Sequence, residues 1–265
     1  MDDPVILYGR QRPAGVVEHL EAGPVRLKFQ DGELRYLRVG GREIVRRVYF
    51  AVRDRRWDTV MPAFERVEVN RHDGGFTIDL SARCANDVAE YAWTARIEGT
   101  GAGKITFAVR GEAPKAFRSP RVGLCVLFGA EALAAQRYEL LDAEGQAEGE
   151  FPRAIRSDLL SRRFAGLRYV TADGLAVSCR LAEGSFGMED QRNFGDSSYK
   201  AFSGMAYAFP DVPAGVAQVD DVEDVAAVNG EYFGEIRPAS TIVVVAGLVD
   251  PRWKVEVELD AFVED

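Results

Sequence analysis

Residues 187–200 hold a dense set of side chains that could do chemistry. Ten of these fourteen residues can donate or accept a hydrogen bond through a side chain, and the set includes three carboxylates, one guanidinium and one ammonium. A packed core would not hold such groups together unless they satisfied one another or met a ligand. This polar stretch is therefore the first candidate for a functional site.

The spacing within the polar stretch suggests two faces. If residues 188–193 are extended, alternate side chains point in opposite directions, and Asp190 and Arg192 would form a buried ion pair on one face. The other face would present three polar side chains to a cleft: Glu189, Gln191 and Asn193. A structural network that ties a loop to a sheet explains the same residues equally well.

Asp196 and Lys200 lie four residues apart and would be neighbours if residues 197–201 form a helical turn. An exposed pair of that kind contributes only about 0.3–0.5 kcal/mol. Oxygen ligands from Glu189, Asp190 and Asp196 could in principle hold a hard cation, but carboxylates often share a loop without metal. We predict no metal site and no cofactor.

Arginines crowd the first quarter of the chain. They include Arg35, Arg38, Arg46, Arg47, Arg53, Arg55 and Arg56. Arginine at alternate strand positions usually lies on a solvated face, but a guanidinium can also bind a carboxylate through two parallel hydrogen bonds. We therefore keep Arg38 and Arg53 as candidate substrate-binding residues.

Several runs of residues carry a family resemblance. MEDQRN at 188–193, followed by an aromatic residue, D, S, an aromatic residue and K, resembles a motif of the N-terminal domain of bacterial D-apionate lactonases, enzymes of branched-sugar catabolism. Further runs match in order: LYG (7–9), AGP (22–24), LRYLRVGG (34–41), RRVYFAVRDRRW (46–57), RVGLCVL (121–127) and FP (151–152). The resemblance spans about residues 7–215.

The resemblance implies a protein that binds or acts on a sugar acid or its lactone. Lactone hydrolysis needs an activated water and a positive group near the developing oxyanion. The candidate catalytic residues are Glu189 or Asp196 as the base and Lys200, with Arg53 as an alternative cation. The candidate substrate-binding residues are Arg38, Arg53, Asp190, Gln191, Asn193 and Tyr199.

Two departures from the family pattern favour other functions. Phe128-Gly129 and Ser157-Asp158-Leu159 stand where the family has His-Pro and His-Gln-Pro, and histidine is the side chain best suited to proton transfer near neutral pH. Family members also continue into a barrel-like domain and a C-terminal domain. The alternatives are a non-catalytic module that binds carbohydrate or docks onto a separate catalytic subunit, and, on architecture alone, a mutarotase-like isomerase.

The elements that must position these residues are strands. Apolar residues alternate with polar ones on both sides of the turns at 31–32, 73–75, 99–103 and 173–174, which predicts successive hairpins, with closing strands at 241–245 and 253–259. Residues 130–141 fit a helix or a strand. At least ten strands without a repeated βα unit predict an all-β fold, a large antiparallel two-sheet β-sandwich. Its size resembles the galactose-mutarotase supersandwich, and we expect one domain over 1–265.

Net charge, missing motifs and cysteine placement exclude several classes of function. The net charge is −9 and the sequence pI is about 5.0, which argues against a non-specific binder of nucleic acid or anionic membranes. GxSxG, Walker, HExxH and paired CxxC motifs are absent from the sequence. Cys84, Cys125 and Cys179 are expected to be buried reduced thiols. An acidic N-terminus without a secretory signal predicts a cytoplasmic protein, and a free sheet edge makes a homodimer an option.

Overall fold

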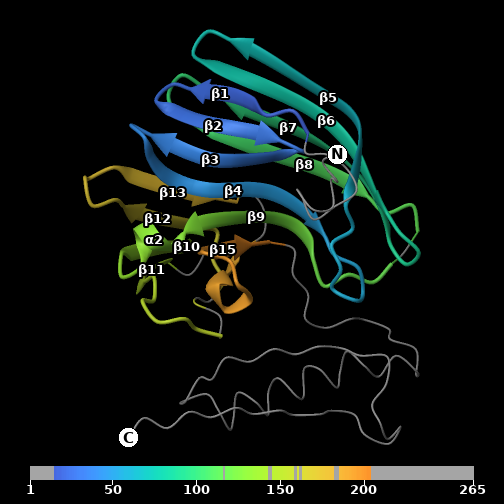
Figure 1. Cartoon of the computed structure of the whole chain (residues 1–265). Helices are drawn as coiled ribbons and strands as arrows, with labels where there is room; N and C mark the ends of the chain where they lie inside the picture. Colours follow the sequence, from blue (N-terminus) through green and yellow to red (C-terminus); the bar gives the residue numbers. More distant parts are fainter. Residues whose placement is uncertain are drawn as a thin grey trace, which may run out of the picture. The chain divides into compact units, whose positions relative to one another are not determined.

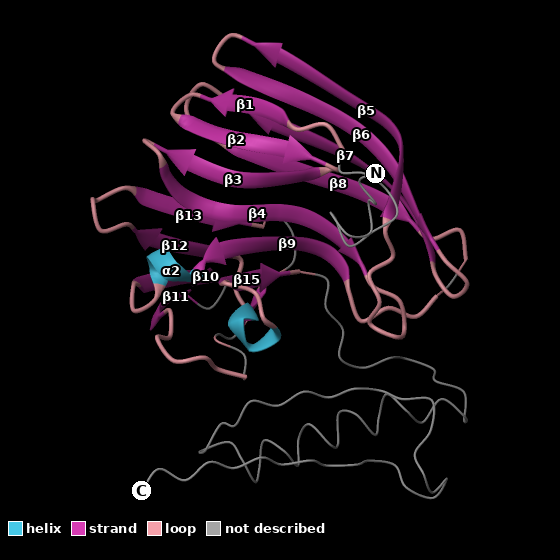
Figure 2. Ribbon diagram, viewed as in Figure 1, coloured by secondary structure: helices cyan, strands magenta, loops and turns pink. Residues whose placement is uncertain are grey.

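The computed structural model describes residues 15–203, apart from 116, 143–144, 158–159, 161–162 and 182–184. This part of the chain forms fifteen strands and two four-residue helices, and every strand pairing is antiparallel (Figures 1 and 2). The prediction of an all-β sandwich is confirmed.

Seven strands form the largest sheet, in the order β1-β2-β3-β4-β9-β15-β14. Their bounds are β1 Glu18–Ala22, β2 Val25–Gln30, β3 Glu33–Val39, β4 Arg42–Val52, β9 Val122–Gly129, β15 Ser198–Phe202 and β14 Gly187–Asp190. Strands far apart in the sequence meet here, because β9 pairs with β4 on one side and with β15 on the other.

Two four-stranded sheets complete the fold. One has the order β5-β6-β7-β8, with β5 Pro62–His72, β6 Gly75–Ala85, β7 Glu90–Gly99 and β8 Ile105–Glu112. The other has the order β11-β10-β12-β13, with β11 Gly145–Glu150, β10 Arg137–Asp142, β12 Gly166–Val170 and β13 Ala176–Arg180. Both lie against the same face of the seven-stranded sheet (Figure 1).

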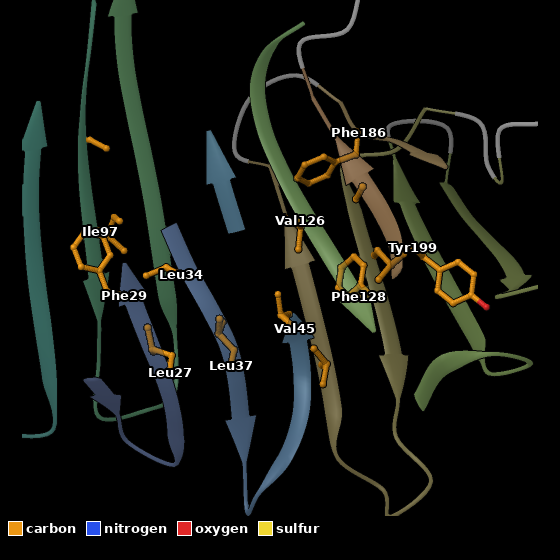
Figure 3. Close-up of a cluster of buried hydrophobic side chains, with 14 of the residues drawn as sticks. Leu27, Phe29, Leu34, Leu37, Val45, Ile97, Val126, Phe128, Phe186 and Tyr199 are labelled. Carbon is orange, nitrogen blue, oxygen red and sulfur yellow. The ribbon is translucent and has the colours of Figure 1, made fainter. Parts of the chain in front are cut away.

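One hydrophobic core fills the space between the layers (Figure 3). Phe50 of β4 packs on Trp93 of β7 with ring centroids 5.1 Å apart, and Phe128 of β9 packs on Tyr169 of β12 at 6.0 Å. Alternation along the strands directs the other side chains to the opposite face of the seven-stranded sheet, which we call the outer face. A smaller buried cluster lies there: Ala51, Cys125, Leu127 and Phe202, with Tyr49 packed against it.

The predicted hairpins are confirmed. Asp31 and Gly32 both have positive φ, 51° and 75°, as expected for the Asp-Gly turn that joins β2 to β3. Residues 130–141 contain both predicted alternatives, since helix α2 (Ala130–Leu133) is followed by strand β10.

Replacing Gly32 with alanine should lower the free energy of unfolding. The loss should exceed the cost of placing a residue with a Cβ in the left-handed backbone conformation. That conformation costs about 1–2 kcal/mol for a residue with a Cβ, and a Cβ at Gly32 would lie 2.4 Å from Cζ of Phe64. Gly40→Ala is the matched control, because Gly40 also has a positive φ of 56° but no atom within 4 Å of its Cβ position. Chemical denaturation should give the larger loss for Gly32→Ala, and equal losses would contradict the packing argument.

Several predictions concern the remainder of the chain. The chain divides into two compact units, Met1–Phe209 and Pro210–Asp265, and the described residues belong to the first. The closing strands expected at 241–245 and 253–259 lie outside the described residues, and the single domain over 1–265 stays a prediction.

The prediction of buried thiols is confirmed for Cys84 and Cys125 and only in part for Cys179. Cys84 and Cys125 are buried, Cys179 is half-buried, and all three are free thiols. Burial raises the pKa of Cys84 and raises that of Cys179 to about 12, which keeps both thiols protonated. Across the described residues, no helix has the length and apolar character needed to cross a membrane.

Candidate functional site

The polar stretch is a strand, a single 3₁₀ turn and a second strand. β14 ends at Asp190, the 3₁₀ helix η1 spans Gln191–Phe194, and β15 begins at Ser198. The expected extended conformation through residue 193 is wrong after Asp190, because the Asp190 carboxylate accepts a hydrogen bond from the Arg192 backbone N–H at 3.1 Å and caps the turn. The helical turn considered for residues 197–201 is also not formed, because β15 pairs there with β9 and β14.

The predicted ion pair between Asp190 and Arg192 is present and buried. Arg192 donates to the Asp190 carboxylate from Nε at 2.9 Å and from Nη2 at 2.7 Å, and the Arg156 backbone N–H donates to it at 3.1 Å. Arg192 also donates to the carbonyl oxygens of Pro152 and Arg153, and the Tyr199 hydroxyl donates to that of Pro152 at 2.7 Å. These contacts, which we call the loop clasp, tie the loop at 152–156 to the hairpin.

The outer face carries a second polar group, which we call the Glu189–Lys200 site. Lys200 donates to the Glu189 carboxylate, and Gln191 Nε2 donates to the same oxygen at 3.0 Å. The Arg121 guanidinium approaches this oxygen at 3.7 Å and lies 4.4 Å from the Phe202 ring centroid. The side chains are only 4% exposed for Arg121, 5% for Lys200 and 16% for Glu189, so the charges are largely shielded from water.

Strand pairing extends this site across the sheet. Glu189 pairs with Lys200, Lys200 with Leu127, and Leu127 with Arg47, while the next row joins Phe202, Cys125 and Tyr49. The Arg47 guanidinium lies 4.1 Å from the Tyr49 ring centroid. Arg53 lies at the end of these strands, where its backbone N–H donates to the Arg121 carbonyl at 2.8 Å.

Burial changes the acid–base properties of this region. Desolvation lowers the pKa of Lys200, although the Glu189 carboxylate partly opposes the shift, and Arg121 lowers it further. Desolvation also raises the pKa of Tyr49, with Cys125 contributing in the same direction and Arg47 and Arg53 opposing it. Burial of several interacting ionisable groups on one surface is typical of functional sites.

Cations outnumber carboxylates here among the described residues. Glu33 accepts hydrogen bonds from both Arg35 and Arg47, and Glu189 is shared by Lys200 and Arg121. Arg53 donates from Nη1 to the Trp57 carbonyl at 2.8 Å, but it has no carboxylate partner in the described part of the chain, and its buried Nε makes no hydrogen bond there. A buried donor without a partner is uncommon in folded proteins, and a ligand oxygen is one group that could satisfy it.

The structure brings some of the predicted residues together and separates others. Glu189, Gln191 and Lys200 are in contact on the outer face, and Arg53 borders the same region. Asp190 and Tyr199 belong to the loop clasp, where protein groups already occupy their polar atoms.

Three predicted residues remain: Asn193, Asp196 and Arg38. Asn193 is exposed on η1, Asp196 is half-buried, and its backbone N–H donates to the Gln191 carbonyl at 3.1 Å. Arg38 lies on β3 and lines a hollow at the other end of the outer face. Glu189 and Asp190 point to opposite faces of β14, so they do not converge on one cation, and the described residues contain no group of three potential metal ligands.

Comparison with known sequences decides the family. The family described as D-apionate lactonase, N-terminal domain, matches residues 5–227, which is most of the chain and includes the whole Glu189–Lys200 site. The chain belongs to this family.

A curated relative agrees with the assignment to the D-apionate lactonase N-terminal domain family. A protein from Brucella anthropi named D-apionate lactonase is 30% identical over 202 residues. That match covers 76% of this chain but only 33% of the relative, so the chain spans about a third of the relative's length.

Within this family domain, sequence reasoning missed Arg47, Tyr49 and Arg121. All three lie in runs that carry the family resemblance, residues 46–57 and 121–127. Their contribution depends on the pairing of β4 with β9, which joins segments about 75 residues apart. The signal was present in the matched runs, but spacing along the chain gave no reason to group them with the polar stretch.

Proposed function

We propose that this chain binds a sugar acid or its lactone at the Glu189–Lys200 site. The observation that carries the proposal is the excess of cations on a shielded part of the outer face, with one guanidinium, that of Arg53, lacking a carboxylate partner among the described residues. A guanidinium in a shielded site favours a carboxylate or an ester carbonyl oxygen, since charge-assisted hydrogen bonds are stronger than neutral ones.

The polar groups beside these cations suit the remainder of such a ligand. Glu189 can accept hydrogen bonds from sugar hydroxyls, and the Gln191 carboxamide can both donate and accept them. Both side chains are only partly buried, so they can exchange their present contacts for contacts with a ligand. The name of the Brucella anthropi relative makes D-apionate and its lactone the first ligands to test.

Hydrolysis of the lactone requires a base and an oxyanion-stabilising group in addition to binding. Glu189 is the predicted base, but Lys200, Gln191 and Arg121 all approach the same one of its oxygens, so protein groups already occupy that oxygen. Lys200 and Arg121 are well placed to stabilise an oxyanion near Glu189. The geometry therefore supports binding more strongly than turnover, and we keep lactone hydrolysis as the second step of the proposal.

A non-catalytic role is the second candidate. The chain spans about a third of the Brucella anthropi relative, which is compatible with a module that binds the sugar acid and docks onto a separate catalytic subunit. A cytoplasmic location and a homodimer stay predictions, and a mutarotase-like isomerase has no specific observation in its favour.

Ligand-induced stabilisation tests the proposal. D-apionate or its lactone, at about 100 times the dissociation constant, should raise the free energy of unfolding by about 2.7 kcal/mol. Arg53→Gln should weaken binding by about 10- to 100-fold, because a hydrogen bond to a charged group contributes about 1.5–3 kcal/mol. Thermal denaturation and calorimetry measure both effects.

Arg66→Gln is the control, since Arg66 lies on β5 with an exposed partner, Glu68. Equal binding by Arg53→Gln and the wild-type chain, or no binding of either ligand, would overturn the proposal. Acid release from the lactone by the purified chain would support hydrolysis, whereas binding without acid release would favour the non-catalytic module.

A further inference from the structure

The outer face of the seven-stranded sheet has a hollow at the end formed by β1, β2 and β3. Its volume is about 530 Å³, and its lining residues are His19, Arg26, Leu27, Lys28, Tyr36 and Arg38. The strand order places this end of the sheet opposite β15 and β14, so it is separate from the Glu189–Lys200 site.

A β-bulge shapes this hollow. Arg26 pairs with Arg38 and Lys28 pairs with Arg35, so two residues of β3 lie opposite the single residue Leu27 of β2. The bulge allows Leu34 and Leu37, three positions apart, to enter the core together. Tyr36 lies between them and is turned outward, with 41% of its surface exposed.

Tyr36 adopts a strained backbone conformation. Its φ is 52°, in the left-handed region that bulky side chains rarely occupy. The core requires a bulge near this position, but an asparagine or glycine would adopt this conformation at a lower cost. Strained residues of this kind cluster at binding and catalytic sites.

The charges around Tyr36 are poorly balanced. The Lys28 ammonium and the Arg38 guanidinium both lie over the Tyr36 ring, each 5.8 Å from its centroid. Within the described residues, Lys28 has no carboxylate within 4.0 Å, and Arg38 only reaches Glu43 at 4.0 Å. Glu43 is held more closely by Arg46, at 2.9 Å. Two cations therefore lie at one ring. This local excess of positive charge occurs on a chain whose net charge is −9.

We infer that this hollow is a second binding site, for an oxyanion held between Lys28 and Arg38. Either a carboxylate or a phosphate group of a small molecule would supply the missing negative charge. The Tyr36 ring holds both cations at the hollow, since each makes a cation–π contact with it. His19, which pairs with Lys28 across β1 and β2, borders the same hollow and can donate a hydrogen bond to the anion.

The histidines allow a local test of this site. The chain contains only two, His19 in the hollow and His72 at the end of β5 in another sheet. We would follow the imidazole resonances by NMR while adding inorganic phosphate or D-apionate at constant pH and ionic strength, with His72→Gln used for assignment. The His19 resonance should move saturably with at least one probe, and the His72 resonance should stay in place.

Charge-neutralising variants complete the test. In Lys28→Gln/Arg38→Gln the apparent dissociation constant reported by His19 should rise about tenfold or more. Lys104→Gln/Arg110→Gln is the control, because it removes two exposed cations from another sheet region. A response to phosphate alone assigns the hollow to phosphate groups, and a response to D-apionate alone assigns it to carboxylates.

The inference is overturned if the His19 resonance moves with neither probe, or if it moves equally in the wild-type chain and in Lys28→Gln/Arg38→Gln. Both results are independent of the proposed function, because Arg53→Gln should weaken the Glu189–Lys200 site without changing the His19 response. A failure of one site is therefore distinguishable from a failure of the other.

Discussion

Replacing Asp190 with alanine is expected to lower the free energy of unfolding by about 3–5 kcal/mol, the cost of breaking a buried charge pair. The Asp190 side chain is fully buried and accepts hydrogen bonds from the Arg192 guanidinium and from two backbone N–H groups. Its removal leaves these donors without their acceptor in a shielded environment. The loop at 152–156 should also lose the hydrogen bond from the Arg156 backbone N–H, one of the contacts that attach it to the hairpin.

Chemical denaturation measures this loss, and amide hydrogen exchange reports whether the loop at 152–156 opens. Glu68→Ala is the matched control, because Arg66 and Glu68 form a pair with the same two-residue spacing on an exposed strand. We expect little change from Glu68→Ala, since exposed ion pairs contribute little to stability. A similarly small change in Asp190→Ala would show that the loop clasp is not a principal stabilising feature.

Lys200→Met should cost about 3 kcal/mol of stability and should abolish ligand binding at the Glu189–Lys200 site. The substitution leaves the Glu189 carboxylate in a shielded position with only Gln191 and the more distant Arg121 as partners. Breaking a buried pair from one side typically costs about 3–5 kcal/mol, and the remaining Arg121 places this case at the lower end.

The double variant Lys200→Met/Glu189→Leu should recover most of that stability but none of the binding. Burial lowers the pKa of Lys200 despite its carboxylate partner, which indicates that the site disfavours the charged ammonium. Two apolar side chains remove this desolvation cost. Chemical denaturation of Lys200→Met, of Glu189→Leu and of the double variant gives the coupling energy between Lys200 and Glu189. Additive losses would contradict the assignment of Lys200 and Glu189 as a coupled pair.

Local patterns predicted the hairpins well. Asp31-Gly32 forms the expected turn because only a few residue types accept positive φ at both positions. The bulge at Tyr36 could not be predicted from period-two alternation. Leu34 and Leu37 cannot both face the core of a regular strand, and only the packed sheet shows that the backbone, rather than a side chain, adjusts.

The candidate site was predicted only in part. The ion pair of Asp190 with Arg192 followed from their spacing, but the same spacing could not show that Asp190 would also cap η1. Grouping Arg121 and Tyr49 with Lys200 required the pairing of β9 with β4 and β15. Such contacts depend on tertiary structure, and the periodicity of a single segment does not contain them.

A crystal structure of this chain with D-apionate would show whether the Glu189–Lys200 site binds a sugar acid. We expect the ligand carboxylate to lie within hydrogen-bonding distance of the Arg53 or Arg121 guanidinium, with ligand hydroxyls on Glu189 or Gln191. Ligand density found only between Lys28 and Arg38 would support the second site but contradict the Glu189–Lys200 site. A saturated crystal with Arg53 and Glu189 in unchanged positions and no ligand beside them would also contradict it.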